Sequence, residues 1–244
     1  MVEPMFRTHL SSPKQGDLIL LAGPEGKHAA SVRRMRVGEG IQLGDGKGLR
    51  VRGTVAEVAT NSLKVQVDSA FQESEPLSKL TLVQALAKGD RDELAVQAAT
   101  ELGAWSVIPW QADRSISKWE GPKITKGVDR WQTIVSEATK QSLRAFEPVV
   151  QAPVSSKQLC DLFKDFDQVL ILDPTAKVGL GSFTLAGNTA AIVVGPEGGI
   201  AEHELQDFEA AGATRVNMGE PILRTSTAGI AAIALLQAKL GLWG

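Results

Sequence analysis

The chain has 244 residues, of which 43% are apolar and 22% are charged, the proportions of a globular protein with ample material for a buried core. Its single cysteine, Cys160, cannot form an internal disulfide, which excludes a cysteine-rich zinc module and fits a reducing cytoplasm. The longest apolar run, residues 228–236, is too short to span a bilayer, and the polar start MVEPMFRTHL does not resemble a secretion signal. We therefore expect a cytoplasmic protein with no membrane partner.

The net charge of −2 is spread unevenly along the chain. Residues 1–70 contain 10 lysines and arginines against seven acidic residues, so the remainder of the chain is acidic. The excess of positive charge is concentrated in the stretches RRMR, at residues 33–36, and RVR, at residues 50–52. A basic segment of this kind fits either an anionic partner or a solvated charged surface, and charge alone leaves both interpretations open.

The first 70 residues predict a small β-rich domain. Short runs rich in β-branched residues are separated by Gly, Asn and Asp turns, at residues 17–23, 40–46, 50–59 and 62–70. GDGKG, at residues 44–48, is a hairpin turn signal, and residues 27–38 predict a short helix ended by Gly38. The pattern is typical of a small barrel that binds nucleic acid. The polar stretch QESEPLSK, at residues 72–79, predicts a linker.

From residue 79 onward the pattern changes to alternating strands and helices. Near-continuous apolar strands of this kind indicate a buried and mostly parallel sheet, and therefore an α/β domain. In the long helix predicted at residues 122–144, one apolar face recurs at spacings of three and four, formed by Ile124, Val128, Trp131, Val135 and Ala138. Strands are expected at residues 79–86, 104–110, 168–173, 189–195 and 214–219, and further helices at 90–103, 202–212 and 225–240.

The tetrapeptide GPEG occurs twice, at residues 23–26 and 195–198. The first copy lies between a predicted barrel strand and a short helix, and the second follows a buried parallel strand. Because the contexts differ, we interpret the match as chance use of turn residues. Only the second copy lies at the carboxyl end of a central strand, where α/β proteins bind ligands.

Two segments of the second half have chemical content. In VVGPEGG, the glycines allow the backbone to approach a ligand closely, but Glu197 would repel phosphate and no GK[ST] ending follows. The loop therefore suits a ligand with a positive centre or with hydroxyls, although a tight strand-to-helix turn explains it equally well. In NMGEPILRTSTAG, Arg224 stands at the entrance of an apolar helix, as either an ion-pair anchor or a substrate-binding group.

These two segments, VVGPEGG and NMGEPILRTSTAGIAAIALLQ, resemble the RsmE family of 16S rRNA (uracil-N3) methyltransferases, which belong to the SPOUT class. KGDRDELAVQAATELGAWSVIPW, RWQTIVSEATKQSLR and HAASVRRMRVGEGIQLGDGKG match the same family in order. The resemblance implies a PUA-like, RNA-binding β-barrel at residues 1–72 and a trefoil-knotted methyltransferase domain at residues 77–244. It also implies a homodimer that acts on 16S rRNA within the small ribosomal subunit, with the final helix at the interface.

The resemblance further implies a set of site residues. S-adenosylmethionine would be held in a bent shape by the three crossover loops of the knot, and no metal is involved. The matching cofactor-binding positions are Leu172, Asp173, Pro174, Val194, Gly195, Pro196, Glu197, Gly198, Gly199, Met218, Gly219, Ile222, Leu223 and Arg224. The basic residues of the barrel, Arg7, Arg33, Arg34 and Arg36, would either contact RNA phosphates or be solvated helix positions. His28 would either contact RNA or pack at the start of the short helix.

Two residues are candidates for catalysis. Uracil N3 carries a proton that must leave before or during methyl transfer, so a cation near the uracil carbonyls would stabilise the developing anion. Arg224 is the candidate for this role. Glu197 either faces the positive end of the cofactor or serves as general base.

The chain departs from the family pattern at two positions. RTSTA carries Ser226 where the family usually has glutamate, which puts in doubt any role for a carboxylate there. GGIA carries Ala201 where a hydroxyl usually caps the next helix.

Alternative functions are a non-catalytic RNA-binding ribosome-assembly factor and a SPOUT methyltransferase acting on tRNA or 23S rRNA. The full-length resemblance favours the uracil-N3 enzyme. The three histidines do not cluster with carboxylates at metal-ligand spacing, so a metal site is not expected.

Overall fold

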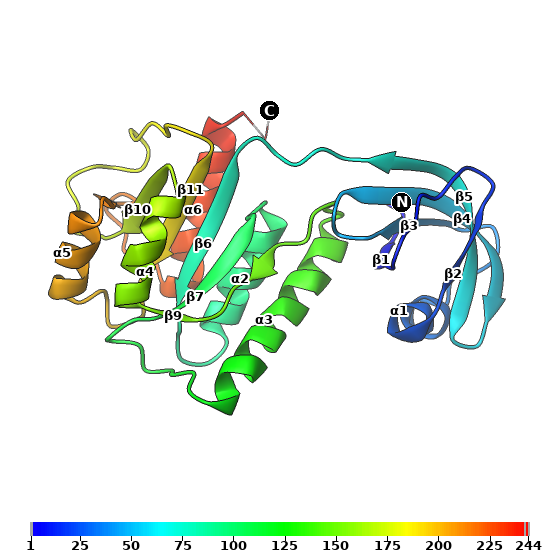
Figure 1. The fold of residues 1–244 in the computed structure, drawn as a ribbon, viewed down its shortest axis with the longest axis horizontal. Coiled ribbons are helices and arrows are strands. Elements are labelled where there is room, and N and C mark those ends of the chain that lie inside the picture. The colour runs from blue at the N-terminus through cyan, green and yellow to red at the C-terminus, as the bar shows by residue number, and fades with distance from the viewer. Residues whose placement is uncertain (1, 242, 244) are drawn as a thin grey trace. The chain divides into compact units, whose positions relative to one another are not determined.

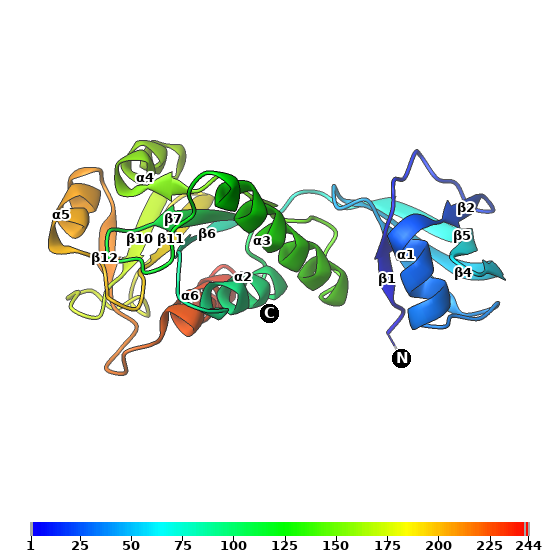
Figure 2. The same ribbon diagram turned by 90° about the horizontal axis from the view of Figure 1, so that it is seen from below.

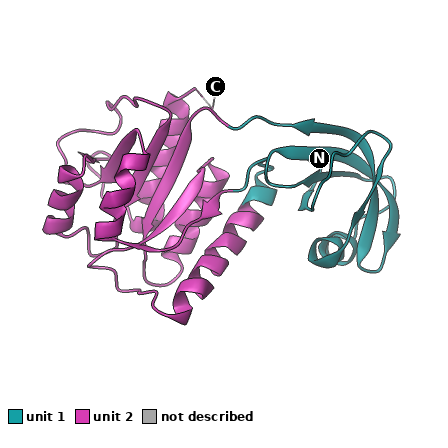
Figure 3. Ribbon diagram, viewed as in Figure 1, with its two compact units in different colours: residues 1–75, 139–147 teal, residues 76–138, 148–244 magenta. Residues whose placement is uncertain are grey.

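The computed structural model describes residues 2–241 and 243, and it divides into two compact units (Figures 1 and 3). Unit 1 comprises the chain as far as Glu75 together with Thr139–Glu147, and unit 2 comprises Pro76–Ala138 and Pro148–Gly244. The outer limits that we expected for the domains, residues 1 and 244, lie outside the described residues. Residues 139–147 belong to unit 1 although they lie far along the chain from its other residues, and no sequence pattern predicted this.

Unit 1 is built on a five-stranded sheet with the order β1-β3-β4-β5-β2. β1 pairs with β3 in parallel, and the other neighbours are antiparallel. The four strands predicted from the sequence are present, but β1 was missed because its three residues lie in a segment of mixed polarity. The strands are β1 (Met5–Arg7), β2 (Leu18–Leu21), β3 (Gly40–Gly44), β4 (Leu49–Ala59) and β5 (Ser62–Gln72).

Alternation of apolar residues along the long strands forms the core of unit 1. In β5, Leu63, Val65 and Val67 are buried, and they pack with residues of the other strands into one apolar cluster. The predicted hairpin turn between β3 and β4 is confirmed, and Asp45 Oδ1 accepts hydrogen bonds from the backbone N–H groups of Lys47 (2.7 Å) and Leu49 (3.1 Å). Such an aspartate stabilises a turn by replacing backbone hydrogen bonds.

The helix predicted at residues 27–38 is displaced towards the N-terminus. α1 (Gly23–Lys27) begins within the first GPEG and continues into a π-helical turn, η1 (His28–Val32). Arg34 then adopts a left-handed conformation with φ of 53°, so the helix ends well before Gly38. The first GPEG is therefore the start of a helix, with Pro24 in the first turn, where its missing N–H costs nothing.

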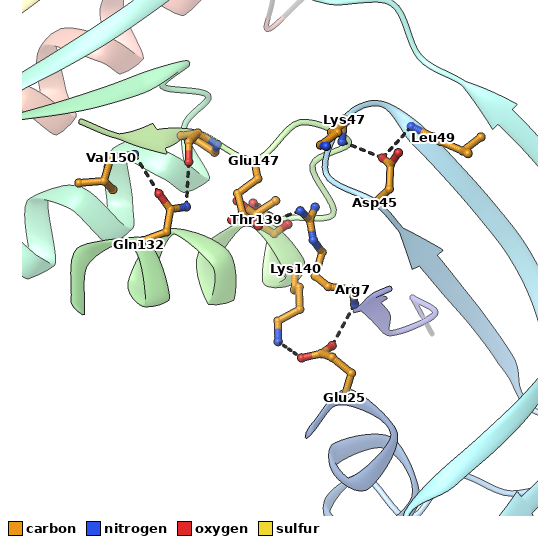
Figure 4. Close-up of polar contacts among 12 residues, drawn as sticks. Arg7, Glu25, Asp45, Lys47, Leu49, Gln132, Thr139, Lys140, Glu147 and Val150 are labelled. Atoms are coloured by element: carbon orange, nitrogen blue, oxygen red, sulfur yellow. Dashed lines mark hydrogen bonds and ion pairs between the residues drawn. The ribbon is translucent and has the colours of Figure 1, made fainter. Parts of the chain in front are cut away.

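Glu25, from the first GPEG, joins three segments of unit 1 (Figure 4). Its Oε2 accepts a hydrogen bond from the Arg7 backbone N–H (2.9 Å), and its Oε1 accepts one from Lys140 Nζ (2.7 Å). The Arg7 guanidinium forms an ion pair with Glu147 at 3.0 Å. These contacts connect β1 and α1 to the segment 139–147, and they explain why that segment belongs to unit 1.

Unit 2 contains a seven-stranded sheet in which every pairing is parallel, as predicted. The order is β12-β10-β11-β6-β7-β8, and β9 pairs with β7. The strands are β6 (Lys79–Ala85), β7 (Ser106–Gln111), β8 (Val149–Val150), β9 (Val154–Ser155), β10 (Gln168–Leu172), β11 (Thr189–Val194) and β12 (Thr214–Val216).

Helices cover both faces of this sheet, which explains its continuous apolar strands (Figure 2). α2 (Arg91–Glu101) and α6 (Thr225–Lys239) pack on the face that contains Leu170 and Leu172. The opposite face, with Val169 and Ile171, packs against α4 (Ser156–Leu162) and α5 (Glu202–Ala210). A 3₁₀ turn, η2 (Phe163–Asp165), follows α4. The elements between residues 148 and 165 were not predicted from the sequence, because each is short.

The long helix α3 (Pro122–Gln141) buries only part of its predicted apolar face. Trp131, Val135 and Ala138 are buried, but Ile124 in the first turn is 38% exposed. Asp90 occupies the N-cap position of α2, but its side chain makes no capping hydrogen bond. Asp92 instead accepts backbone N–H groups, from Ala87 (3.0 Å) and from Glu93 (2.8 Å).

Candidate active site

A cavity of about 590 Å³ opens in unit 2 where β10 and β11 end. Three segments form its walls: the residues after β10, the second GPEG loop after β11, and the segment that leads into α6. Its size is that of a small-molecule binding site. The lining residues are Arg91, Leu172, Asp173, Pro174, Thr175, Val194, Gly195, Pro196, Glu197, Gly199, Ile200, Glu202, Leu205, Ile222, Leu223, Arg224, Thr225 and Ala228.

The second GPEG loop requires glycine at two positions. A Cβ at Gly195 would lie 2.7 Å from Ile200 Cγ1, so the loop folds back too closely for any side chain there. Gly199 has a φ of 72°, a conformation that is open mainly to glycine, and its N–H donates to the Pro196 carbonyl (2.9 Å). The loop is thus a compact turn whose backbone faces the cavity.

Two arginines hold this loop in place, and the sequence analysis assigned neither of them. Arg91 Nη1 donates to Glu197 Oε1 (2.9 Å), which also accepts the Lys88 backbone N–H (3.1 Å). Arg114 Nη1 donates to the Gly198 carbonyl (3.2 Å). Burial alone would raise the pKa of Glu197, but hydrogen bonds from its own backbone, Lys88 and Arg91 outweigh burial and lower it. Glu197 is therefore a carboxylate at neutral pH and a weak base.

A second carboxylate in the cavity is held in the same way. Asp173 Oδ1 accepts the backbone N–H of Thr175 (2.9 Å), and Oδ2 accepts from Arg215 Nε (2.6 Å). Burial acts to raise the pKa of Asp173, and these hydrogen bonds together with the Arg215 charge lower it overall. The residue therefore fixes the turn after β10 as an anion.

Because the pKa of Asp173 is lower in the folded protein than in the unfolded chain, the free energy of unfolding falls at low pH. The Asp173 carboxylate stabilises the fold above its unfolded pKa of about 3.9, and that contribution is lost as pH falls through the lower folded pKa. We expect Asp173→Asn to reduce the free energy of unfolding at pH 7 by about 1–3 kcal/mol, because it weakens a charge-assisted hydrogen bond. Urea unfolding at pH 7 and pH 3 should show a smaller deficit in acid. Asp165→Asn, at an exposed site, is the control, and an equal effect of the two substitutions would contradict the prediction.

The entrance to α6 is tied to the second GPEG loop. Thr225 Oγ1 donates to the Gly195 carbonyl (2.8 Å) and accepts from Gln84 Nε2 (2.9 Å), a buried side chain of β6. Arg224 is the N-cap residue of α6, and its side chain is exposed and lines the cavity. Within residues 2–241 and 243, no hydrogen bond or ion pair engages its guanidinium. Arg224 is therefore free to meet a ligand.

The two departures from the family pattern have distinct structural outcomes. Ser226 is buried in the first turn of α6 and does not line the cavity. Ala201, the N-cap residue of α5, offers no side-chain acceptor, but Glu204 Oε2 accepts its backbone N–H at 3.0 Å. The buried Glu204 also accepts from the Asp113 N–H and from Ser156 Oγ, so it joins α5 to two neighbouring segments.

The structure brings most of the expected cofactor positions together. Eleven of the fourteen line the cavity, and Gly198, Met218 and Gly219 do not. Sequence reasoning missed seven lining residues, namely Arg91, Thr175, Ile200, Glu202, Leu205, Thr225 and Ala228. Thr225 and Ile200 adjoin the recognised motifs and were within reach, whereas Arg91 is more than 100 positions from its partner Glu197.

The expected RNA-binding residues all lie in unit 1. His28 packs edge-on against Phe6, with ring centroids 5.7 Å apart, and it lines a small hollow together with Arg33. Arg33, Arg34 and Arg36 are exposed. Arg7 differs, because its guanidinium pairs with Glu147 and lies against Gly46.

Metal ligands and membrane spans are both missing from the described residues. No group of three or more His, Cys, Asp or Glu residues in the described part of the chain is arranged to hold a metal ion. Among the helices as described, none is long and apolar enough to cross a membrane.

Matches to models of known protein families identify the class of protein. Residues 73–237 match the model of an RNA methyltransferase domain, and residues 21–68 match that of an RNA methyltransferase PUA domain. The fold therefore consists of a PUA-like domain followed by a SPOUT-class methyltransferase domain with a parallel sheet, as the sequence predicted.

Individual relatives then define the family. Ribosomal RNA small subunit methyltransferase E from Mycobacterium bovis is 37% identical over 95% of this chain and 90% of its own length. The protein of the same name from Bacillus subtilis is 32% identical over 88% of each chain. A structure of the enzyme from Neisseria gonorrhoeae, bound to S-adenosyl methionine, covers 100% of this chain and 99% of its own, with 29% identity and a TM-score of 0.86. The chain belongs to the ribosomal RNA small subunit methyltransferase E family.

Proposed function

We propose that the protein transfers a methyl group from S-adenosylmethionine to N3 of a uridine in 16S rRNA of the small ribosomal subunit. The observation that carries this proposal is the cavity of unit 2, in a chain related over nearly its whole length to small-subunit rRNA methyltransferases. When bound there, the cofactor supplies an electrophilic methyl group on a sulfonium. Ribosomal RNA is found in the cytoplasm, and we propose that the protein works there.

The residues of the cavity suit this cofactor. Leu172, Val194 and Leu223 provide apolar walls, and the glycine-rich loop lets the backbone approach a ligand closely. The carboxylates of Asp173 and Glu197 are each paired with an arginine, so the cavity offers groups of both charges to a cofactor that carries a sulfonium, an ammonium and a carboxylate. We propose that the eleven expected positions that line the cavity contact the cofactor. Gly198, Met218 and Gly219 do not line it, and we propose that they stabilise the loops that do.

The roles of Arg224 and Glu197 follow from their surroundings. Arg224, exposed at the cavity and without a partner in the described residues, would stabilise negative charge on the uracil carbonyls as the N3 proton leaves. Glu197 is engaged by Arg91 and Lys88, and its lowered pKa makes it a poor general base. These contacts favour the role in which Glu197 holds the loop and faces the positive end of the cofactor.

We further propose that the protein forms a homodimer through α6 and that its chain is knotted around the cavity. α6 presents a half-buried apolar strip of Ile230, Ala231, Ala234 and Leu235, which suits the interface of a homodimer. The loops after β10 and β11 and the segment before α6 together surround the cavity, which is the arrangement expected for the crossovers of a trefoil knot.

Methyl transfer from labelled S-adenosylmethionine tests the function. The substrates are unmodified small ribosomal subunits, free 16S rRNA, 23S rRNA and tRNA, each followed by nucleoside analysis. A 3-methyluridine product in the small subunit is expected. Transfer to tRNA or 23S rRNA instead would show that the protein is a methyltransferase with a different RNA substrate. Absence of both methyl transfer and cofactor binding would favour a non-catalytic assembly factor.

Unit 1 would bind phosphates of the RNA. We expect Arg33→Ala combined with Arg36→Ala to weaken rRNA binding by about tenfold, because both side chains are exposed cations. The slope of log affinity against log salt should fall by about 0.7–0.9 for each arginine–phosphate interaction that the substitutions remove. Filter binding over a range of salt concentrations measures both quantities. The control is Arg7→Ala, which should act mainly through stability, since Arg7 pairs with Glu147.

A further inference from the structure

A second groove, of about 490 Å³, lies in unit 2 outside the candidate cofactor cavity. Its walls come from the turn after β6, the start of α2, the loop before α3 and the first turns of α3. None of the expected site residues belongs to it. The lining residues are Ala87, Gly89, Asp92, Glu93, Ile116, Ser117, Lys118, Trp119, Lys123, Lys126, Gly127, Arg130 and Trp131.

The groove carries unbalanced positive charge. Lys118, Lys123 and Lys126 are exposed, and no ion pair engages them within the described part of the chain. Neither acidic residue of the lining forms an ion pair with these lysines. Glu93 pairs with Arg130 (2.7 Å), and the buried Asp92 accepts hydrogen bonds from two backbone N–H groups. Three free lysines around one groove favour an anionic ligand.

An aromatic platform lies in the same groove. Trp119 lies so close to α3 that a Cβ on Gly127 would be 2.5 Å from its Cδ2 and Cε2 atoms. Its ring also meets Trp131 edge-on, with centroids 5.0 Å apart and planes at 72°. Glycine inside a helix costs about 1 kcal/mol relative to alanine, and here it provides the space for the indole. The Trp119 ring is only partly buried, and Ile116 beside it is 68% exposed.

The groove adjoins the candidate cofactor cavity through one short turn. Ala87 and Gly89 line the groove, and Arg91, two residues further along, lines the cavity. The N–H of Lys88, which lies between Ala87 and Gly89, donates to Glu197 of the second GPEG loop. A polymer that occupies the groove would therefore run towards the cavity. Cations combined with a partly exposed aromatic ring are the features that bind single-stranded nucleic acid.

We propose that this groove binds a single-stranded segment of the RNA substrate that flanks the methylated nucleotide. One base stacks on Trp119, and Lys118, Lys123 and Lys126 contact the phosphates on either side. The inference rests on the proposed function for the identity of the RNA, but the groove and its charges stand independently of it.

The test uses the full-length chain and a fluorescein-labelled single-stranded oligoribonucleotide, with binding measured by fluorescence anisotropy. The variant Lys123→Ala with Lys126→Ala changes two exposed side chains and should leave the fold intact. We expect its dissociation constant to rise about tenfold and its salt slope to fall by about 1.4, which corresponds to about 0.7 for each phosphate that a lysine neutralises on a single strand. The matched control is Lys157→Ala with Lys164→Ala, two exposed lysines of unit 2 outside the groove.

The stacking platform is tested separately. Trp119→Leu removes the indole ring. Gly127→Ala keeps the ring but displaces it, because the new Cβ on α3 would occupy the space where the ring lies. Both variants should weaken oligoribonucleotide binding by about five- to tenfold while the salt slope stays at the wild-type value, since both retain every cation. Thermal unfolding of each variant shows whether it is folded in the assay.

The outcomes separate this inference from the proposed function. S-adenosylmethionine binding by calorimetry should be the same in wild type and in the lysine variant. If the wild type methylates RNA while the lysine and Trp119 variants bind the oligoribonucleotide as tightly as the control, the groove inference is overturned. If the wild type transfers no methyl group but the groove variants bind RNA more weakly, the groove stands and the proposed function fails. Binding of polyglutamate with no binding of RNA would overturn the groove inference in favour of an acidic protein partner.

Discussion

Replacing Arg224 by alanine should reduce the rate constant of methyl transfer by about 10²–10³-fold, the usual effect of removing one group that stabilises an oxyanion. Arg224 lines the cavity from the N-cap of α6, and its guanidinium is not engaged by any described residue, so its charge is available to the substrate. The free energy of unfolding should change by less than about 0.5 kcal/mol, because the side chain is exposed. Single-turnover methylation at saturating cofactor measures the rate.

Two comparisons make the result specific. Arg224→Lys keeps a positive charge and should retain more activity than Arg224→Ala, although it loses the planar donor geometry. The pH profile of the rate should move to higher pH in Arg224→Ala, since a uracil anion without a nearby cation forms only at higher pH. Cofactor affinity is measured separately for each variant, because Arg224 also lines the proposed cofactor cavity and saturating cofactor must be reached before rates are compared. A variant with the wild-type rate and pH profile would remove Arg224 from catalysis.

Sequence patterns predicted the framework of unit 2 because its strands are buried on both faces. β10 and β11 are apolar at every position except their first residues, Gln168 and Thr189, and this continuous pattern is distinctive. The short elements between residues 148 and 165 lack such a signal. β8 and β9 have two residues each, and their pairing with β7 is decided by contacts distant in sequence.

The candidate site was predictable where it is made of backbone and not where it depends on long-range partners. The second GPEG loop and the segment 217–224 before α6 are local motifs. Their glycines and prolines are turn residues that can be recognised in the sequence itself. Arg91 reaches Glu197 only because β6 and β11 are adjacent in the sheet, a pairing that no local pattern contains. Segment 139–147 joined unit 1 for a similar reason, through a bond from Lys140 to Glu25.

Replacing Gly26 by alanine should destabilise unit 1 by about 3 kcal/mol, the upper end of the usual cost of overpacking. A Cβ at this position would lie 2.5 Å from the Leu21 carbonyl oxygen and 2.8 Å from that of Asn61. Both are backbone atoms, one at the end of β2 and one in the turn before β5, so neither can rotate away as a side chain would. Thermal or urea unfolding of the full-length chain measures the change in stability.

Gly198 occupies the same place in the second GPEG and provides the matched control. The nearest atoms to a Cβ there would be those of Arg114, with its Cβ at 3.3 Å and its carbonyl oxygen at 3.6 Å, so Gly198→Ala should cost less than about 1 kcal/mol. Cofactor affinity should be retained in folded Gly26→Ala, because Gly26 lies in unit 1 and the cavity lies in unit 2. Equal destabilisation of the two variants would contradict this account. The four residues that the copies share thus serve different ends, since the first GPEG packs a helix against backbone carbonyls and the second shapes a cavity wall.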